Sequence, residues 1–301
     1  MVYDLIVIGA GPSGITAAVY AARKEMNFIV LTGDIGGQTI WSGDIENYTG
    51  YQFITGPELA AKFEDHMRTY GISVKENEKV RAIEKVAGII RVETDKALYE
   101  AKTIIIASGK TSKELGVPGE KEFRNKGLTY CATCDGPLFS GKPVAIIGGG
   151  NSALDAALQL MKIATKVYII NNRAELIGDA VMRNKVESSS IVEIMNDANV
   201  VQIVGDKMVS GIKVLRHGKE SLLPVEGVFV EIGLVPNSKF ADIVDKNELG
   251  EIKITSYNET SSPGIFAAGD VTNVPEKQIV IAAGEGSKAS LGAFRYLSRN
   301  R

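Results

Sequence analysis

Both cysteines of the chain lie in one short segment, Cys131-Ala-Thr-Cys134, and an acid, Asp135, follows directly. Two cysteines separated by two residues are typical either of half a zinc site or of a dithiol that cycles with a disulfide. Thiol–disulfide exchange also needs a group that gives and takes a proton at the leaving thiolate, and Asp135 is placed to do so. The spacing predicts a redox-active pair with an adjacent acid.

Two other interpretations of the cysteine pair are weaker. A structural zinc site needs about four nitrogen or sulfur ligands. The chain offers only two histidines, His66 and His217, and no second CxxC motif, so no metal site is predicted. Two thiols buried by coincidence would suit an apolar segment, but Thr133, Asp135 and Gly136 make this one polar and loop-like.

A glycine-rich turn lies near the start of the chain. An apolar run at 4–8 (DLIVI) is typical of a buried parallel strand, GAGPSG follows at 9–14, and ITAAVYAARK at 15–24 has a helical pattern. Gly9 allows a tight turn, Gly11 lets the backbone approach a pyrophosphate, and Gly14 lets the helix pack against the strand. With a second strand at 28–31, this order predicts a dinucleotide site at the helix N-terminus.

The same unit recurs later in the chain. The strand PVAII at 143–147 precedes the turn at 148–153, and a helix and a strand at 167–170 follow. Six residues of the first copy, Ile8, Gly9, Gly11, Ser13, Ala17 and Ala18, are identical at a constant offset to Ile147, Gly148, Gly150, Ser152, Ala156 and Ala157. Two matches in register indicate a repeated nucleotide-binding unit. The alternative is that one copy is a purely structural domain.

The pattern around the two copies predicts an α/β protein with two Rossmann-like three-layer nucleotide-binding domains, the second inserted into the first. A helix that opens at Thr55-Gly-Pro57 and runs to about Tyr70 lies between the copies, and a helix closes the chain. The expected boundaries are residues 1–112 plus 245–301 for the first domain and 113–244 for the second, which carries the CxxC motif.

Composition excludes several function classes. The net charge is −2, so no overall attraction for nucleic acid or anionic lipid is expected. No apolar run reaches the roughly 18 residues of a membrane span, and the first residues lack the pattern of a signal peptide. We expect a soluble cytoplasmic protein. Two nucleotide sites and one dithiol offer an electron path from a nicotinamide to a flavin and on to a disulfide, which indicates a reductase serving another protein.

The chain resembles the low-molecular-weight thioredoxin reductases over essentially its whole length. The matching blocks, in order, are GGQ at 36–38, IENYTG at 45–50, CATCDG at 131–136, GGGNSA at 148–153, FVEIGLVPN at 229–237 and GIFAAGD at 264–270. The stretches CDGPLF at 134–139 and KQIVIAAGEGSKASL at 277–291 resemble the flavoprotein component of alkyl hydroperoxide reductase even more closely. That flavoprotein carries an extra N-terminal thioredoxin-like module, whereas this chain starts at the flavin domain, so a separate partner is expected.

The resemblance implies a bound FAD and a nicotinamide nucleotide, and it implies which residues contact them. The implied FAD residues are Gly9, Gly11, Pro12, Ser13, Gly14, Asp34, Ile35, Gly36, Gly37, Gln38, Thr39, Asn47, Gly269, Asp270, Lys277, Gln278 and Ile279. Among them, Asp270 would bind the ribityl chain, and Lys277, Gln278 and Ile279 would lie near the isoalloxazine. The implied nicotinamide-nucleotide residues are Gly148, Gly150, Asn151, Ser152, Ala153 and Arg173.

The resemblance also implies roles at the cysteine pair. Cys134 would face the flavin, Cys131 would attack the disulfide of a thioredoxin-like or peroxiredoxin-system partner, and Asp135 would be the acid/base. In members of this family the nicotinamide domain rotates between flavin reduction and disulfide exchange. The linkers near 112–116 and 243–248 are therefore expected to be hinges. A homodimer is implied as well.

One departure from the family bears on the electron donor. The members that use NADPH carry a His-Arg-Arg cluster and a later arginine around the 2′-phosphate, whereas this chain has Asn171, Asn172, Arg173 and then Ile177. Asparagine does not replace a bidentate guanidinium, which argues against NADPH. NADH sites usually place an acid at the position of Asn171, and Asn can still pair with a ribose hydroxyl. NADH is therefore favoured over NADPH, and ferredoxin or a deazaflavin stays an alternative donor.

Two other functions fit the same residues. A dithiol oxidase of this architecture would send electrons from the disulfide to oxygen and would need no nicotinamide. A non-catalytic redox or nucleotide sensor would use the folds only for binding. The adjacent acid, Asp135, argues against the sensor.

Overall fold

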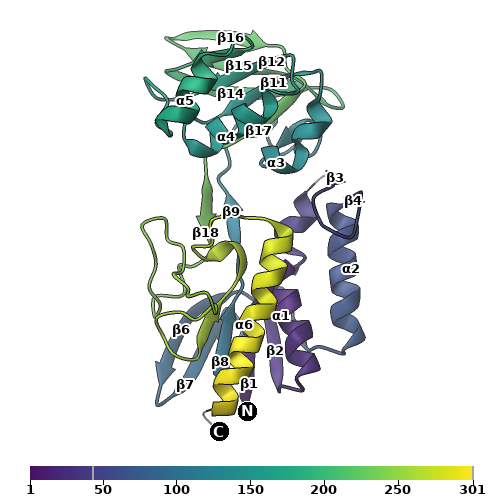
Figure 1. The fold of residues 1–301 in the computed structure, drawn as a ribbon, viewed down its shortest axis with the longest axis vertical. Helices are drawn as coiled ribbons and strands as arrows, with labels where there is room; N and C mark the ends of the chain where they lie inside the picture. The colour runs from purple at the N-terminus through teal and green to yellow at the C-terminus, as the bar shows by residue number, and fades with distance from the viewer. Residues whose placement is uncertain (43, 300–301) are drawn as a thin grey trace. The chain divides into compact units, whose positions relative to one another are not determined.

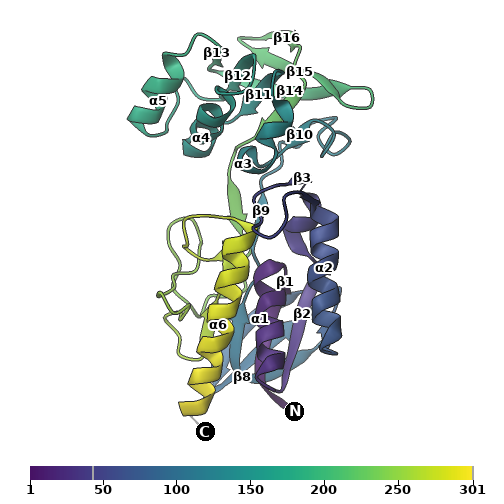
Figure 2. The same cartoon turned by 45° about the vertical axis from the view of Figure 1, so that its right-hand side comes forward.

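The chain folds into two compact units, and the computed structural model describes residues 1–42 and 44–299 (Figures 1 and 2). Unit 1 comprises Met1–Trp41, Glu46–Thr111 and Val235–Arg301, and unit 2 comprises Ser42–Ile45 and Ser112–Leu234. The main segment of unit 2 begins and ends in two paired strands, β9 (Lys110–Ser112) and β18 (Leu234–Pro236). The predicted fold class, two nucleotide-binding α/β domains with the second inserted into the first, is confirmed.

The second boundary differs from the sequence-based one. The sequence places it after residue 244, whereas the structure places it between Leu234 and Val235. The segment 243–248, expected to be a hinge, belongs to unit 1, where the side chain of Val244 is buried in a core with Ala241 and Ile252. Its polar composition resembles a linker, but its apolar residues are packed.

Unit 1 is built on a seven-stranded sheet in the order β5-β2-β1-β8-β7-β6, with β19 paired to β8. The strand β1 is parallel to β2 and β8, and β7 is antiparallel to both of its neighbours. Leu5 and Val7 of β1 pack on one face against α1 and α6, whereas Ile6 and Ile8 pack on the other, as the two-residue period of a buried strand requires. The bounds are β1 Val2–Ala10, β2 Phe28–Ile35, β5 Val74–Lys75, β6 Val80–Val86, β7 Ile89–Thr94, β8 Leu98–Ile106, β19 Ile265–Ala267, α1 Pro12–Arg23, α2 Gly56–Thr69 and α6 Ile279–Arg299.

Unit 2 repeats the plan with a five-stranded parallel sheet in the order β10-β17-β11-β12-β13. Val144 and Ile146 of β11 pack against α4, and Ala145 and Ile147 pack against the antiparallel sheet β14-β15-β16. The bounds are β10 Leu128–Thr129, β11 Pro143–Ile147, β12 Lys166–Ile170, β13 Val192–Met195, β14 Ala198–Gly205, β15 Val209–Arg216, β16 Lys219–Leu223, β17 Gly227–Val230, α3 Ala132–Asp135, α4 Asn151–Leu160 and α5 Ala180–Glu187.

Short elements complete the chain. They are the strand pair β3 (Asp44–Ile45) and β4 (Ile54–Thr55) and the 3₁₀ helices η1 (Gly37–Trp41), η2 (Gly136–Phe139) and η3 (Gly269–Val271). Thr55 caps α2 through a reciprocal capping box with Glu58, so the predicted start of this helix is confirmed. Within residues 1–42 and 44–299, no helix is long and apolar enough to cross a membrane.

Candidate active site

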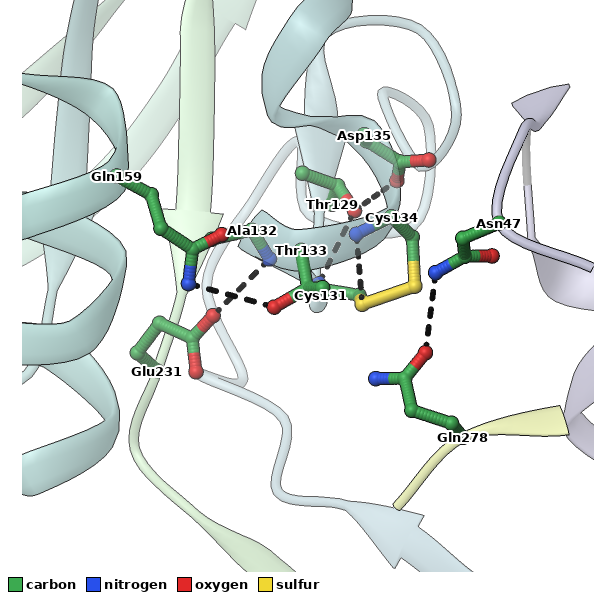
Figure 3. The surroundings of a disulfide bond; sticks show 10 residues. All are labelled: Asn47, Thr129, Cys131, Ala132, Thr133, Cys134, Asp135, Gln159, Glu231 and Gln278. Atoms are coloured by element: carbon green, nitrogen blue, oxygen red, sulfur yellow. Dashed lines mark hydrogen bonds between the residues drawn. A yellow bond between two sulfur atoms is a disulfide. The ribbon is translucent and has the colours of Figure 1, made fainter. Parts of the chain in front are cut away.

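Cys131 and Cys134 form a disulfide at the start of the short helix α3 (Figure 3). Cys131 is the N-cap residue, and the backbone N–H of Cys134 donates to its Sγ at 3.1 Å. Both residues are half-buried. After reduction, an N–H that points at the sulfur of Cys131 stabilises negative charge there, so the local backbone favours Cys131 as the thiolate.

Asp135 is buried in the same turn, and its carboxylate is held by Thr129 of β10. The Thr129 hydroxyl donates to Oδ2 of Asp135 and accepts from the backbone N–H of Cys131 at 3.2 Å (Figure 3). Thr129 thus connects the acid to the first cysteine. The sequence points to Asp135 but not to Thr129, because the contact follows from the strand that precedes the motif.

A second carboxyl lies beside the CxxC helix, on Glu231, which follows the strand β17. Its Oε1 accepts from the backbone N–H of Ala132 at 3.4 Å (Figure 3). Burial raises the pKa of Glu231 to about 7, the Ala132 hydrogen bond opposes this rise, and the charge of Asp155 adds to it. Sequence reasoning assigned Glu231 no role. The available signal was an acid placed directly after the apolar strand GVFV.

The second glycine turn joins β11 to α4. Gly148 has φ +138°, and a Cβ there would lie 2.4 Å from the carbonyl oxygen of Glu231, so only glycine fits. Gly150 is the N-cap of α4, and a Cβ there would meet nothing within 4 Å. Ser152 is exposed and Ala153 is buried. The backbone of this turn is therefore open on the side where a phosphate would approach the helix.

Asn171, at the end of β12, is turned into the protein, which corrects the expectation that its amide is available to a ribose. Its side chain is 1% exposed. The Nδ2 group donates to the carbonyls of Arg173 at 3.1 Å and Glu175 at 2.9 Å and to Oδ1 of Asn196 at 2.9 Å. The Oδ1 atom accepts from Arg173 N at 3.3 Å. Asn171 thus fixes its own loop, a role that sequence position alone does not separate from ligand binding.

The same loop is tied to the glycine turn. Oδ1 of Asn151 accepts from the backbone N–H of Asp179 at 2.7 Å, and the N–H of Ile177 donates to the carbonyl of Gly149 at 2.8 Å. Arg173 is exposed, and Ile177, four residues further along the loop, is 57% exposed. A second guanidinium, that of Arg183 on α5, reaches the same loop and donates to the carbonyl of Leu176 at 3.1 Å. The surface offered to the adenosine end of a nucleotide thus combines Arg173 and this engaged arginine with an apolar side chain.

The first glycine turn also contains two kinds of glycine, those that tight packing requires and one that leaves the backbone open. Gly9 has φ +104°, with a Cβ position 2.4 Å from the carbonyl oxygen of Ala107, and a Cβ on Gly14 would lie 1.9 Å from the carbonyl oxygen of Gly9. Gly11, in contrast, has nothing within 4 Å of its Cβ position. Gly9 and Gly14 are therefore needed for packing, and Gly11 leaves an open approach to the N-terminus of α1.

Two of the other glycines implied for FAD lie against this turn, within unit 1. The Cβ position of Gly37 is 3.2 Å from Gly11 Cα, and that of Gly269 is 2.6 Å from Oγ of Ser13. Nδ2 of Asn47 donates to Oε1 of Gln278 at 3.1 Å. The remaining implied residues are spread along unit 1. Pro12 opens α1, Asp34 and Ile35 end β2, Gly36 follows β2, and Gln38 and Thr39 belong to η1. Asp270 lies in η3, Lys277 precedes α6, and Ile279 is its first residue.

One of the implied FAD residues, Lys277, belongs to a cluster of charged side chains inside unit 1. Nζ of Lys110 pairs with Oε1 of Glu251, and Nζ of Lys277 lies 3.3 Å from the same oxygen. Burial lowers the pKa of Lys277, as does Lys110, while Glu251 opposes the effect. Burial raises the pKa of Asp270 against the charges of Lys277 and Lys110. Sequence reasoning missed Lys110 and Glu251, since they are far apart in the chain and belong to no motif.

The residues present fit a flavin dinucleotide. Oγ1 of Thr39 is buried and has no hydrogen-bond partner within the described part of the chain, as expected where a ligand supplies one. Gly11 has open space at its Cβ position, and Gly36 and Gly37 have positive φ. The glycine turn and the loop beside it therefore expose backbone that no side chain covers. Open backbone N–H groups at a helix N-terminus are well suited to bind a phosphate.

The chain belongs to the pyridine nucleotide-disulphide oxidoreductase family, whose model matches residues 3–286. This family implies FAD and a pyridine nucleotide as cofactors. A crystal structure of thioredoxin reductase from Streptococcus pyogenes is similar, with a TM-score of 0.92, 36% identity and 99% of each chain covered. The protein is therefore thioredoxin reductase-like, an oxidoreductase of the flavoprotein class with a CxxC disulfide.

Two curated relatives share 41% identity over 302 residues, which covers 99% of this chain. One is a Bacillus subtilis protein named NADH dehydrogenase, of which the match covers 59%. The other is a Staphylococcus aureus protein named as a subunit of alkyl hydroperoxide reductase, of which it covers 60%. The chain spans about three fifths of the length of these relatives.

Proposed function

We propose that the protein is an FAD-dependent disulfide reductase that passes electrons from NADH, in preference to NADPH, through FAD and the Cys131–Cys134 pair to a thioredoxin-like protein. The observation that carries this proposal is the disulfide itself, with the Cys134 N–H on the sulfur of Cys131 and the buried Asp135 linked to the same turn through Thr129. The bound flavin would supply a two-electron relay between the donor and the disulfide.

The residues of this turn have distinct tasks in the exchange. Reduction of the disulfide takes two electrons and two protons and gives two thiols. The Cys131 thiolate, favoured by the Cys134 N–H, then attacks a disulfide sulfur of the partner, and a mixed disulfide forms while a partner thiolate leaves. Cys134 attacks the sulfur of Cys131 and releases the partner as a dithiol. Asp135 would give and take the protons of the leaving thiolates.

The donor preference rests on the loop after β12. Within the loop itself Arg173 is the charged donor, next to the exposed Ile177, and the guanidinium of Arg183 from α5 already donates to the carbonyl of Leu176 at 3.1 Å. We infer that this set is too small for a dianionic 2′-phosphate. The name of the Bacillus subtilis relative supports NADH. Since the amide of Asn171 is used within the protein, we infer that other groups would hold the ribose. We propose the exposed Asn172, the next residue in the chain, as one of them.

The acceptor follows from the two kinds of relative. The similarity to thioredoxin reductase supports a separate thioredoxin-like acceptor, and the similarity to the Staphylococcus aureus alkyl hydroperoxide reductase protein supports a peroxiredoxin system behind it. We also infer a homodimer, by the resemblance to the thioredoxin reductases.

Anaerobic titration tests the donor. The holoprotein is mixed separately with NADH and NADPH, and the bleaching of the flavin band near about 450 nm is followed, with dithionite as the control for full reduction. Rapid bleaching by NADH and slow or no bleaching by NADPH is the expected result. If dithionite bleaches the flavin and neither nucleotide does, the donor assignment is wrong, and ferredoxin or a deazaflavin becomes the donor to test.

A further inference from the structure

Glu231 connects the CxxC helix to the second glycine turn. Its Oε1 accepts from the backbone N–H of Ala132 at 3.4 Å, and its own N–H donates to the carbonyl of Ile147 at 2.8 Å. Its carbonyl oxygen is the atom that forbids a side chain at Gly148. The backbone of Glu231 is thus fixed by β11 and the turn, and its side chain is directed to the residue that follows Cys131 (Figure 3).

We propose that Glu231 is a positioning residue for the Cys131–Cys134 pair, and that its change of protonation sets how readily the reduced thiols ionise. The proposal rests on the function proposed above, in which this pair is the exchange group. A carboxylate close to a thiol opposes a second negative charge and so raises the thiol pKa, whereas a neutral carboxyl does not. The hydrogen bond to Ala132 places that charge one residue from Cys131.

The surroundings keep the proton on Glu231 up to neutral pH. Burial raises the pKa of the Glu231 carboxyl to about 7, against the hydrogen bond from Ala132. Asp155 on α4 adds a like charge. On α3 the only carboxyl is Asp135, and it accepts from Thr129. Nζ of Lys113 lies 4.0 Å from the Cβ position of Gly233, two residues beyond Glu231 along the chain.

The sign of the effect follows from these charges. Below about pH 7 the Glu231 carboxyl is neutral, and the thiols ionise at the pKa set by the local backbone. Above that pH the carboxylate favours protons on the thiols, so thiolate accumulates with pH less steeply than it would without Glu231. The dithiol and the carboxyl therefore titrate as a coupled set.

Alkylation of the reduced holoprotein tests the proposal without turnover. The pair is reduced with dithiothreitol, the reductant is removed anaerobically, and iodoacetamide is pulsed between about pH 5 and about pH 9, which spans the titration of Glu231 and of a thiol. Mass spectrometry then gives the rate at Cys131 and at Cys134. We expect Glu231→Gln, which keeps an oxygen for Ala132, to abolish the inflection near pH 7 and to move the thiol midpoint down by about half a unit to one unit.

Two further variants keep the test decisive. Glu226→Gln removes an exposed acid just before β17 and is expected to match the parent. Asp155→Asn removes the like charge and is expected to move the inflection to lower pH without abolishing it, so it decides the question if Glu231→Gln does not fold. A Glu231→Gln profile that superimposes on the parent, or an Asp155→Asn inflection that stays in place, would overturn the proposal. Neither result depends on a donor or an acceptor, so failure of the proposed function would be seen separately.

Discussion

The hydroxyl of Thr129 donates to the carboxylate of Asp135 and, at the same time, accepts from the backbone N–H of Cys131. Both side chains are buried. A carboxyl group held in this way has a fixed direction relative to the CxxC turn, which a group that exchanges protons with a leaving thiolate needs.

Removing the acid is expected to slow the exchange step. Asp135→Asn should lower the rate of thioredoxin reduction by about a hundredfold, the lower range for loss of a general acid/base, and Thr129→Val should lower it less. Thr133→Val is the matched control, because Thr133 is exposed and its hydroxyl accepts from Gln159 of α4. Steady-state rates across pH, with flavin reduction measured separately, check this, and an Asp135→Asn rate equal to the parent would exclude the assigned role.

Two glycines of the first turn are expected to respond in opposite ways to the same methyl group. A Cβ on Gly14 would lie 1.9 Å from the carbonyl oxygen of Gly9, so Gly14→Ala should unfold unit 1 or lower its melting temperature strongly. Gly11 has φ −79° and open space at its Cβ position, so Gly11→Ala should leave the apoprotein stable. It should still weaken FAD binding, because the methyl group lies where the pyrophosphate approaches. Thermal melts of the apoproteins and FAD titrations check both, and full FAD affinity in Gly11→Ala would contradict the assigned flavin site.

The ion pair of Lys110 and Glu251 is expected to stabilise unit 1. Both side chains are buried, so Lys110→Met should cost about 2 kcal/mol, less than a fully broken pair, because Glu251 keeps Lys277 and Asn247. Lys246→Met, which removes a surface pair with Asp242, should cost less than about 0.5 kcal/mol. Urea unfolding gives both values, and equal costs would contradict this account.

The ion pair of Lys110 and Glu251 also determines how acid changes the stability of unit 1. Burial would raise the pKa of Glu251, but the hydrogen bonds from Lys110 and Asn247 and the charges of both lysines outweigh it and hold that pKa below its ordinary value. Its contribution to the free energy of unfolding is therefore complete above the unfolded pKa of about 4.3 and is lost as the pH falls through the lower folded-state pKa. In Lys110→Met the folded-state pKa of Glu251 should rise toward the unfolded value, so the loss of stability in acid should be smaller and should be complete at higher pH. Urea unfolding of both proteins across this pH range measures the difference.

Asn171 and Asn172 are neighbours with different expected roles. Asn171→Ala removes four part-buried hydrogen-bond contacts of a buried side chain, so it should lower the free energy of unfolding of unit 2 by about 2 to 3 kcal/mol. Asn172→Ala, at an exposed position, should leave stability within about 0.5 kcal/mol and raise KM for NADH. Denaturation curves and steady-state kinetics check the pair. The assignment is wrong if Asn171→Ala is as stable as the parent and weakens NADH binding.

The fold was predictable from the sequence because its signals are local. The turns at Gly9 and Gly148 each follow a buried strand and precede a helix, and Thr55 with Glu58 marks the start of α2. The cysteine pair and Asp135 were predictable for the same reason. Contacts between distant segments were not, because no short motif encodes the approach of Glu231 to Ala132 or of Lys110 to Glu251.

Asn171 shows a further limit of sequence reasoning. Its position after β12 suits a ribose-binding residue, but its direction is set by the carbonyls of Arg173 and Glu175 and by Asn196. Only the folded loop separates these two uses of one amide. The boundary near Leu234 was misplaced for a related reason, since the polar segment that follows is packed into unit 1.

The central claim is that electrons reach the acceptor through the Cys131–Cys134 disulfide. The most direct test compares NADH-driven reduction of thioredoxin by the parent and by Cys134→Ser, with bleaching of the flavin by NADH measured in both. The account predicts that Cys134→Ser still takes electrons from NADH into the flavin but no longer reduces thioredoxin. Thioredoxin reduction by Cys134→Ser at the rate of the parent would contradict it.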